Sequence, residues 1–160
     1  MNYEPLNHEK MVRLRAAKVE AVVQDVPDVE VAGDPEGDLL IVAWGSTYGS
    51  ITAALNAQRA KGRKIGHVHL RHLNPLPKNL GEVLKRYKKV LVPEMNMGQL
   101  VLWLRAKYLV DAIGCNKIQG KPFKQAELEA KIEEVLGVKR TVPEVEPVEI
   151  RARVARGQEN

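Results

Sequence analysis

Cysteine is almost absent from the sequence, since Cys115 is the only one among 160 residues. One thiol cannot form an intrachain disulfide, and it cannot build a cysteine-rich zinc site or an iron–sulfur cluster. Long apolar runs are also missing, because none approaches the roughly 20 residues that span a bilayer. The first residues lack the basic and apolar pattern of a secretory signal. These absences predict a cytoplasmic chain that does not cross a membrane and has no cysteine-rich metal site.

Aromatic side chains are scarce, at 4% of the residues, and the excess of basic charge is small. The chain has 25 Lys and Arg against 20 Asp and Glu, a net charge of +5. Only Arg151, Arg153 and Arg156 are concentrated in one segment. A nucleic-acid-binding domain usually shows a basic stripe with aromatic side chains that stack on bases. The composition therefore argues against nucleic acid as a partner.

What the sequence does contain is an alternation of short apolar runs with helical stretches. A hydrophobic content of 44% in a chain of this length is enough for a packed core. The expected strands are 39–44, 65–70, 90–92 and 111–115, and the expected helices are 50–61, 80–88, 98–109 and 125–136. This order predicts an α/β fold with a largely parallel sheet and helices on both faces.

The chain is expected to have three parts, of which the α/β domain over 39–137 is the central one. The segment 1–38 should hold an amphipathic helix over 7–23, capped by Asn7, followed by a connector rich in Pro and Gly. A helix before a long connector is typical of a junction with another domain. Residues 138–160 are expected to be an extended charged tail or an added edge strand.

Two loops follow expected strands at the edge where open α/β sheets bind ligands. The first contains Gly45, Ser46, Thr47 and Gly49, whose spacing fits neither the dinucleotide-binding nor the P-loop motif. A tight turn between strand and helix is the favoured interpretation, and an anion site at the helix N-terminus is the alternative.

The second loop contains Glu94, Asn96, Gln99 and Gly98 and precedes the helix 98–109. A single carboxylate without a partner acid, base or nucleophile is weak support for catalysis. A ligand-binding crevice and a helix N-terminus capped by these side chains are equally good interpretations. The sequence therefore offers no catalytic residue.

Three histidines, His67, His69 and His72, raise the question of a metal site. The first two alternate correctly to share one face of a strand, but His72 lies beyond its end. No carboxylate stands at a spacing that would complete a set of ligands. Histidines that are hydrogen-bonded under a helix or at the rim of the sheet are therefore favoured over a metal site.

The helix 98–109 is apolar nearly all round, so more than one of its sides should be covered. The outward face is expected to pack on another domain or subunit, with a central core helix as the alternative. The residues expected at such interfaces are Val101, Leu102, Trp103 and Tyr108 on this helix, and Met11 and Leu14 on the N-terminal helix.

Several segments match a known family in order along about residues 3–137. They are WGSTYG at 44–49, GHVHLRHLNPLP at 66–77 and VPEMNMGQL at 92–100, with HEKMVRLR at 8–15 and NKIQGKPF at 116–123. These segments resemble the C-terminal portion of the alpha subunit of 2-oxoacid:ferredoxin oxidoreductases, most closely the 2-oxoglutarate type. The resemblance implies a transketolase C-terminal-like fold, a three-layer α/β/α sandwich.

The resemblance also implies an activity for the whole complex. The family oxidatively cleaves a 2-oxoacid, transfers the acyl group to coenzyme A and passes electrons to ferredoxin. Thiamine diphosphate, magnesium and iron–sulfur clusters serve this chemistry, and other parts of the alpha subunit and the beta subunit hold the thiamine cofactor. The family's G-D-G…N-N thiamine motif is missing, since Gly33-Asp34 precedes Pro35 and Gly37-Asp38 precedes Leu39.

These departures imply a chain that binds no cofactor and is not catalytic alone. We expect a structural and assembly domain, present as a fragment, split subunit or excised domain. Its expected partners are the remaining alpha-subunit domain and the beta subunit, with ferredoxin as an indirect one. The alternative is a stand-alone anion- or nucleotide-binding module that uses the two loops.

Overall fold

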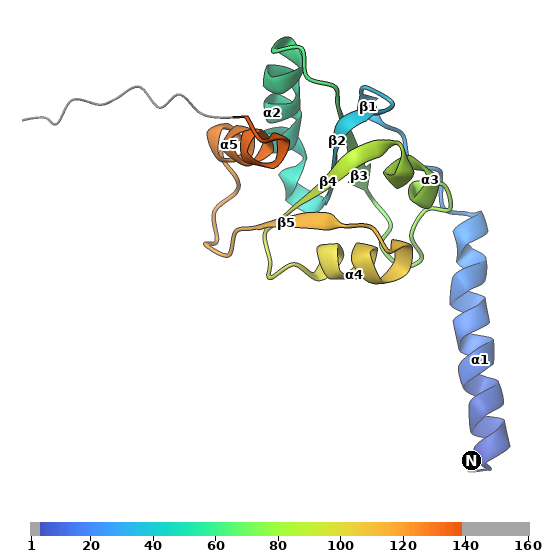
Figure 1. Cartoon of the computed structure of the whole chain (residues 1–160). Coiled ribbons are helices and arrows are strands. Elements are labelled where there is room, and N and C mark those ends of the chain that lie inside the picture. The colour runs from blue at the N-terminus through green and yellow to red at the C-terminus, as the bar shows by residue number, and fades with distance from the viewer. Residues whose placement is uncertain (1–3, 139–160) are drawn as a thin grey trace, which may run out of the picture.

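The computed structural model describes residues 4–138 and contains a five-stranded sheet in the order β1-β3-β2-β4-β5 (Figure 1). The three pairs β2·β3, β2·β4 and β4·β5 are parallel, whereas β1 is antiparallel to β3. The α/β fold with a largely parallel sheet is thereby confirmed. The strands are β1 Ala32–Gly33, β2 Gly37–Trp44, β3 Ile65–Leu70, β4 Tyr87–Glu94 and β5 Ala112–Asn116.

Helices cover both faces of the sheet, which gives the expected three layers. One apolar core lies under α2 and α5, and the other lies under α3 and α4. The α-helices are α1 Pro5–Ala21, α2 Tyr48–Ala60, α3 Leu80–Lys85, α4 Gln99–Tyr108 and α5 Gln125–Leu136, with 3₁₀ turns η1 Val22–Gln24 and η2 Gly45–Thr47. None of the helices within residues 4–138 combines the length and the apolar character that a membrane crossing requires.

The central strand β2 shows why the sheet is covered on both sides. Successive side chains of a strand point to opposite faces. Leu39 and Ile41 accordingly join the core under α2 and α5, whereas Leu40 and Val42 join the core under α3 and α4. All four are at most 1% exposed. A near-continuous apolar run is therefore required here, as in other buried parallel strands.

Three predicted boundaries around β4 were wrong, namely the end of the preceding helix and both ends of the strand. The helix expected over 80–88 ends at Lys85, because Tyr87 enters the sheet and its hydroxyl donates to the carbonyl of Asp34. The strand expected over 90–92 extends to Glu94. The pairing of β4 with β2 reaches Leu91. The strand continues past Pro93 because it pairs there with β5, where Pro93 lies opposite Cys115.

The N-terminal helix α1 differs from the predicted amphipathic helix. It begins at Pro5, a residue favoured in the first turn, so Asn7 lies inside the helix and does not cap it. No residue of α1 is buried, and the helix projects away from the sheet (Figure 1). Met11 and Leu14 are 45% and 53% exposed, because nothing in the described part of the chain packs against them.

The connector between α1 and β2 is more ordered than expected. Ala32 and Gly33 pair with β3 as the short strand β1, which two residues are too few to reveal in a hydrophobic pattern. Asn79, just before α3, binds the backbone of Val29 through two hydrogen bonds of 2.9 Å. The connector is therefore held against the β3 side of the sheet.

Candidate functional site at the carboxyl edge of the sheet

The two loops singled out in the sequence meet at the carboxyl edge of the sheet, because β2 and β4 are neighbours. Together they line a hollow of 190 Å³. The lining residues are Trp44, Gly45, Ser46, Thr47, Glu94, Met95 and Asn96. Gly49 does not contribute to this hollow and lies at the exposed start of α2.

Glu94 and Asn96 serve the N-terminus of α4. The two carboxylate oxygens of Glu94 accept hydrogen bonds of 2.9 Å from the backbone N–H groups of Leu100 and Val101. Asn96 Oδ1 accepts from the N–H groups of Gly98 at 2.7 Å and Gln99 at 3.3 Å. The free N–H groups of a first helical turn normally attract anions. Here the protein's own oxygens occupy them.

Gly98 allows this arrangement. Its φ of 99° lies in the left-handed region, which a residue with a Cβ atom rarely adopts. A Cβ atom would also lie 2.9 Å from the side chain of Asn116. With Glu94 only 1% exposed, this loop has the features of a buried helix cap, one of the two interpretations that the sequence left open.

The Gly45–Thr47 turn at the start of α2 is bound differently. The hydroxyl of Thr47 donates to the carbonyl of Trp44 at 2.9 Å, and Ser46 Oγ lies 3.7 Å from Met95 Sδ. Within the described residues, α2 receives no side-chain cap. This turn therefore keeps more capacity for an anion than the α4 terminus does, although its hydroxyl groups already have partners.

Two of the three histidines, His67 and His69, contact each other edge to face beside this turn. The rings of His67 and His69 lie 5.6 Å apart, and Tyr48 lies within 5.8 Å of both. His69 Nε2 donates to the carbonyl of Gly45 at 3.1 Å, so its Nδ1 is the acceptor of a neutral ring. His72, the histidine expected to lie beyond the strand, is exposed and takes no part in this ring contact.

Burial lowers the pKa of both His67 and His69 and so favours their neutral forms. His67 is 2% exposed, and this burial, with a smaller contribution from His69, lowers its pKa to about 4. Burial, aided by the charge of Arg71, also lowers the pKa of His69. In the described part of the chain, His67 Nε2 and His69 Nδ1 have no hydrogen-bond partner. No group of three potential metal ligands occurs among residues 4–138.

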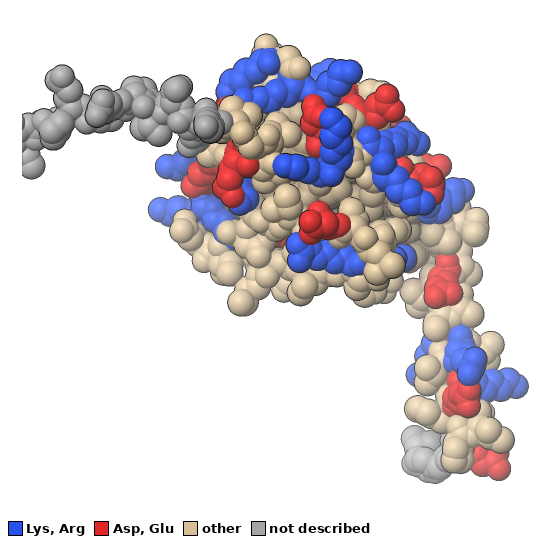
Figure 2. Space-filling model, in the orientation of Figure 1, with Lys and Arg blue, Asp and Glu red and all other residues tan. Residues whose placement is uncertain are grey.

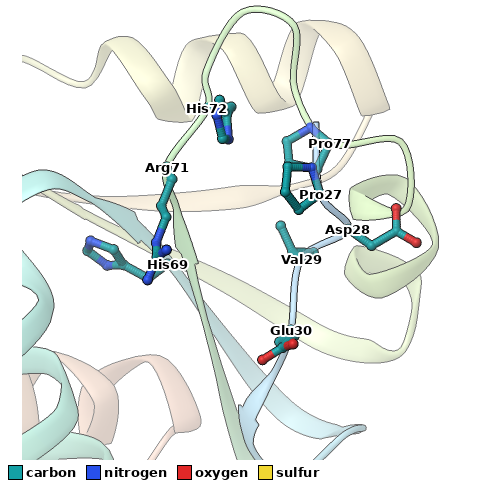
Figure 3. A pocket seen from close by; sticks show the side chains of 8 residues that line it. All are labelled: Pro27, Asp28, Val29, Glu30, His69, Arg71, His72 and Pro77. Atoms are coloured by element: carbon teal, nitrogen blue, oxygen red, sulfur yellow. The ribbon is translucent and has the colours of Figure 1, made fainter. Parts of the chain in front are cut away.

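Further hollows continue along the same edge. One of 310 Å³ lies between the end of β3 and the connector, with Arg71 and His69 on one wall and Val29 and Glu30 on the other (Figure 3). Another of 270 Å³ is mainly apolar and lies between Trp44 and Trp103. The sequence reasoning did not identify Trp44, Arg71 or Leu73 as site residues. Arg71 could have been found, because it directly follows a strand at the ligand-binding edge.

The outward face of α4 is narrower than expected. Val101 is only 8% exposed, and it belongs to the domain's own core, so it does not lie on that face. Tyr108 is half-buried against the same core, where its ring lies next to Gly81. Leu102 and Trp103 remain 64% and 45% exposed. Only these two residues of the predicted α4 surface are accessible to a partner.

The charges on the surface are mixed. Figure 2 shows basic and acidic side chains interspersed over the face in view, without a large field of one sign. Several of them form ion pairs, such as Arg59 with Asp34 at 2.9 Å and Lys88 with Asp38 at 2.8 Å. A basic stripe of the kind that tracks a nucleic-acid backbone is missing from this view.

Known proteins are similar to this chain in sequence and in fold. The subunit KorA of a 2-oxoglutarate oxidoreductase from Mycobacterium tuberculosis is 54% identical over 125 residues, which are 77% of this chain and 19% of that subunit. The structure of a 2-oxoglutarate:ferredoxin oxidoreductase from Magnetococcus marinus, with 2-oxoglutarate, coenzyme A and succinyl-CoA bound, superposes with a TM-score of 0.77. At 33% identity, that match covers 84% of this chain and 24% of the other.

A split-gene transketolase has the same fold, with a TM-score of 0.51 at 23% identity over 69% of this chain and 42% of the other. The transketolase-like architecture expected from the resemblance is thereby confirmed. The chain spans about a fifth of the length of the M. tuberculosis relative. The family described as pyruvate:ferredoxin oxidoreductase core domain II matches residues 37–128, more than half of the chain. The chain belongs to this family of 2-oxoacid:ferredoxin oxidoreductase domains.

Proposed function

We propose that this chain is a structural and assembly domain of the alpha subunit of a cytoplasmic 2-oxoglutarate:ferredoxin oxidoreductase. The observation that carries the proposal is α1, a helix of 17 residues none of which is buried. Such a helix is about 25 Å long, and most of the stability of a helix in a protein comes from packing one of its faces, which α1 does not do within the described residues. Packing against the rest of the complex would stabilise α1, and relatives that are several times longer provide such additional polypeptide.

The chemistry of the complex would then depend on its other parts. Oxidative decarboxylation of 2-oxoglutarate to an acyl-CoA would use thiamine diphosphate with magnesium, and iron–sulfur clusters would pass electrons to ferredoxin. The residues of this chain do not fit these groups. Cys115 is a single thiol, and the carboxylate of Glu94 already accepts two backbone hydrogen bonds. We therefore assign no catalytic step to this chain.

Two surfaces are proposed as contacts with other subunits or domains, one on α1 before the connector and one on α4 in the α/β domain. Met11 and Leu14 lie on α1, and Leu102 and Trp103 lie on α4; all four are large apolar side chains that are at least 45% exposed. Obligate subunit interfaces are rich in such residues. The remaining alpha-subunit polypeptide and the beta subunit are the partners proposed for them.

Co-purification tests the proposal. The 160-residue chain should co-elute with the remaining alpha-subunit polypeptide and the beta subunit when the three are co-expressed. The double variant Leu102→Glu/Trp103→Glu should reduce the recovered complex at least about tenfold, because it places two charges in an apolar interface. Asn56→Glu, an exposed position on α2 at the opposite face of the sheet, is the matched control. Failure of the unaltered chain to co-elute under any condition would refute the proposal.

A further inference from the structure

Three hollows lie next to one another along the carboxyl edge. Each hollow shares lining residues with the next, since Arg71 and His69 line both the 310 Å³ hollow and a neighbouring one of 620 Å³. Trp44 and Leu73 in turn line that hollow and the apolar 270 Å³ hollow. We define the carboxyl-edge groove by the residues His69, Arg71, Leu73, Trp44 and Trp103. A linear series of open hollows suits an extended segment better than a compact ligand.

One end of the groove carries a cation, Arg71, that has no partner among residues 4–138. The guanidinium of Arg71 makes no hydrogen bond or ion pair within the part of the chain that is described. It lies near His69, whose pKa is lowered mainly by burial and to a smaller extent by the charge of Arg71, and both effects favour the neutral imidazole. An Arg side chain pairs most strongly with a carboxylate, through two parallel hydrogen bonds. Arg71 therefore provides one point of recognition for an acidic side chain.

The acidic side chains on the opposite wall of the groove limit which anions can reach Arg71. Asp28 and Glu30, on the opposite wall, line the 310 Å³ hollow but form no ion pair with Arg71 (Figure 3). The carboxylate of Asp28 points away from the hollow in Figure 3, so Glu30 is the acidic group that would repel a polyanion there. A single carboxylate can reach Arg71 from the hollow that Arg71 shares with Trp44, which Glu30 does not line. This arrangement argues for an isolated acidic residue rather than a nucleic acid.

The other end of the groove is apolar. Trp44 and Trp103 are 37% and 45% exposed, and with Leu73 and Leu100 they surround the 270 Å³ hollow. Exposed Trp side chains around a hollow are typical of the residues that dominate binding energy at protein interfaces. Only Asn74 and Gln99 add polar groups to this lining. A large apolar side chain is the complementary occupant.

The wall of the groove is fixed before binding. Asn79 holds Val29 through two hydrogen bonds of 2.9 Å, and the nearby Pro77 is buried. A wall that is already ordered loses little conformational entropy when a partner binds, which favours affinity. The groove is therefore preorganised rather than formed around its ligand.

We propose that the carboxyl-edge groove binds an extended segment of the remaining alpha-subunit polypeptide, in which a carboxylate stands next to a large apolar side chain. The carboxylate binds Arg71 and the apolar side chain enters the hollow between Trp44 and Trp103. This inference rests on the proposed function. The relatives supply the occupant, because the matched region is only 19% of the M. tuberculosis subunit and 24% of the M. marinus chain.

A peptide array tests the inference separately from assembly. The probe is a set of overlapping peptides of about 15 residues, roughly 50 Å when extended, that covers the M. tuberculosis alpha subunit outside the matched region. The labelled 160-residue chain should bind peptides that contain Asp or Glu beside Leu, Ile, Phe or Trp. Arg71→Glu and Trp44→Ala should each weaken binding at least about tenfold, whereas Arg71→Lys should retain part of it.

Lys64→Glu is the matched charge reversal, because Lys64 precedes β3 at the opposite edge of the sheet and, like Arg71, is exposed to solvent. It should change binding by less than about twofold. Thermal unfolding of each variant verifies that it is folded. If no peptide binds, or if Arg71→Glu binds the same peptides equally well, the groove is not the docking site. Co-elution of the whole complex in that case would leave the proposed function standing. Self-association that Arg71→Glu abolishes would identify a second copy as the occupant and overturn the inference.

Discussion

Asn79 and Val29 exchange two hydrogen bonds across 50 residues of sequence, one in each direction and each 2.9 Å long. The side-chain amide of Asn79 thereby replaces a β-bridge, because it satisfies both the N–H and the carbonyl of Val29. This pairing attaches the connector to the start of α3 and closes one side of the 310 Å³ hollow.

Replacing Asn79 with Ala should therefore reduce the free energy of unfolding by about 1–3 kcal/mol, because two partly buried backbone groups would lose their partners. Urea denaturation measures this change. Asn56→Ala on the exposed side of α2 is the control and should change stability by less than about 0.5 kcal/mol. Equal stability of the two variants would show that the pairing contributes nothing.

Glu94 should be required for stability rather than for any reaction. Glu94→Gln keeps the size of the side chain but replaces one acceptor oxygen with an NH₂ group that cannot accept from Leu100 or Val101. The expected loss is about 1–2 kcal/mol, and Glu94→Ala should lose about 3 kcal/mol. Chemical denaturation of both variants measures the two losses. A Glu94→Gln variant as stable as the unaltered chain would contradict the capping role.

Acid should destabilise the fold through His67. Its pKa falls from 6.5 in the unfolded chain to about 4 in the folded one, because burial disfavours the charged ring. Between these two values the unfolded state binds more protons, so stability decreases as the pH falls from about 6.5 towards 4. The stability is therefore unaffected by His67 protonation above pH 6.5. Below pH 4 the full effect lowers the free energy of unfolding by about 3 kcal/mol.

Denaturation at pH 7 and pH 4.5 measures this dependence. His67→Leu should remove most of the difference, since it deletes the titrating ring and the unpartnered Nε2 together. His72→Leu, at an exposed position, should leave the pH dependence unchanged. An equal pH dependence in all three proteins would show that His67 is not responsible.

The alternative of an anion-binding module leads to the opposite expectation in a ligand screen. Coenzyme A, ATP and 2-oxoglutarate should not raise the melting temperature of the chain, because Glu94 and Asn96 already accept from the amides of α4 and the hydroxyl groups of Ser46 and Thr47 already have partners. A ligand present at 100 times its Kd would stabilise the fold by about 2.7 kcal/mol, which thermal shift detects easily. Saturable stabilisation by any of the three would favour the module.

Local patterns predicted the elements that are buried on a regular face. The bounds of β3 and α5 agree with those expected from the sequence. Each segment has apolar residues at a single regular spacing and is flanked by residues that favour turns. The boundary between α3 and β4 was predicted incorrectly because Tyr87 suits either element. Its position is decided by a tertiary contact with Asp34, which no local pattern contains.

The site was less accessible to sequence reasoning than the fold. That Glu94 and the Gly45–Thr47 turn would meet follows from their places after parallel strands. The groove could not be foreseen, because Trp44, Arg71 and Trp103 come from three elements whose spacing depends on the packing of the sheet. The inward position of Val101 likewise depends on how α4 is rotated by its cap.

If the chain assembles as proposed, the unburied helix α1 should make unassembled copies sensitive to proteases. Lys10, Arg13 and Arg15 are all exposed along it, so trypsin can reach several peptide bonds whenever the helix frays. A partner that covers α1 would protect these bonds and extend the lifetime of the polypeptide. The cellular level of this chain would then follow the supply of its partner, so that unassembled copies are degraded and the subunit ratio is maintained.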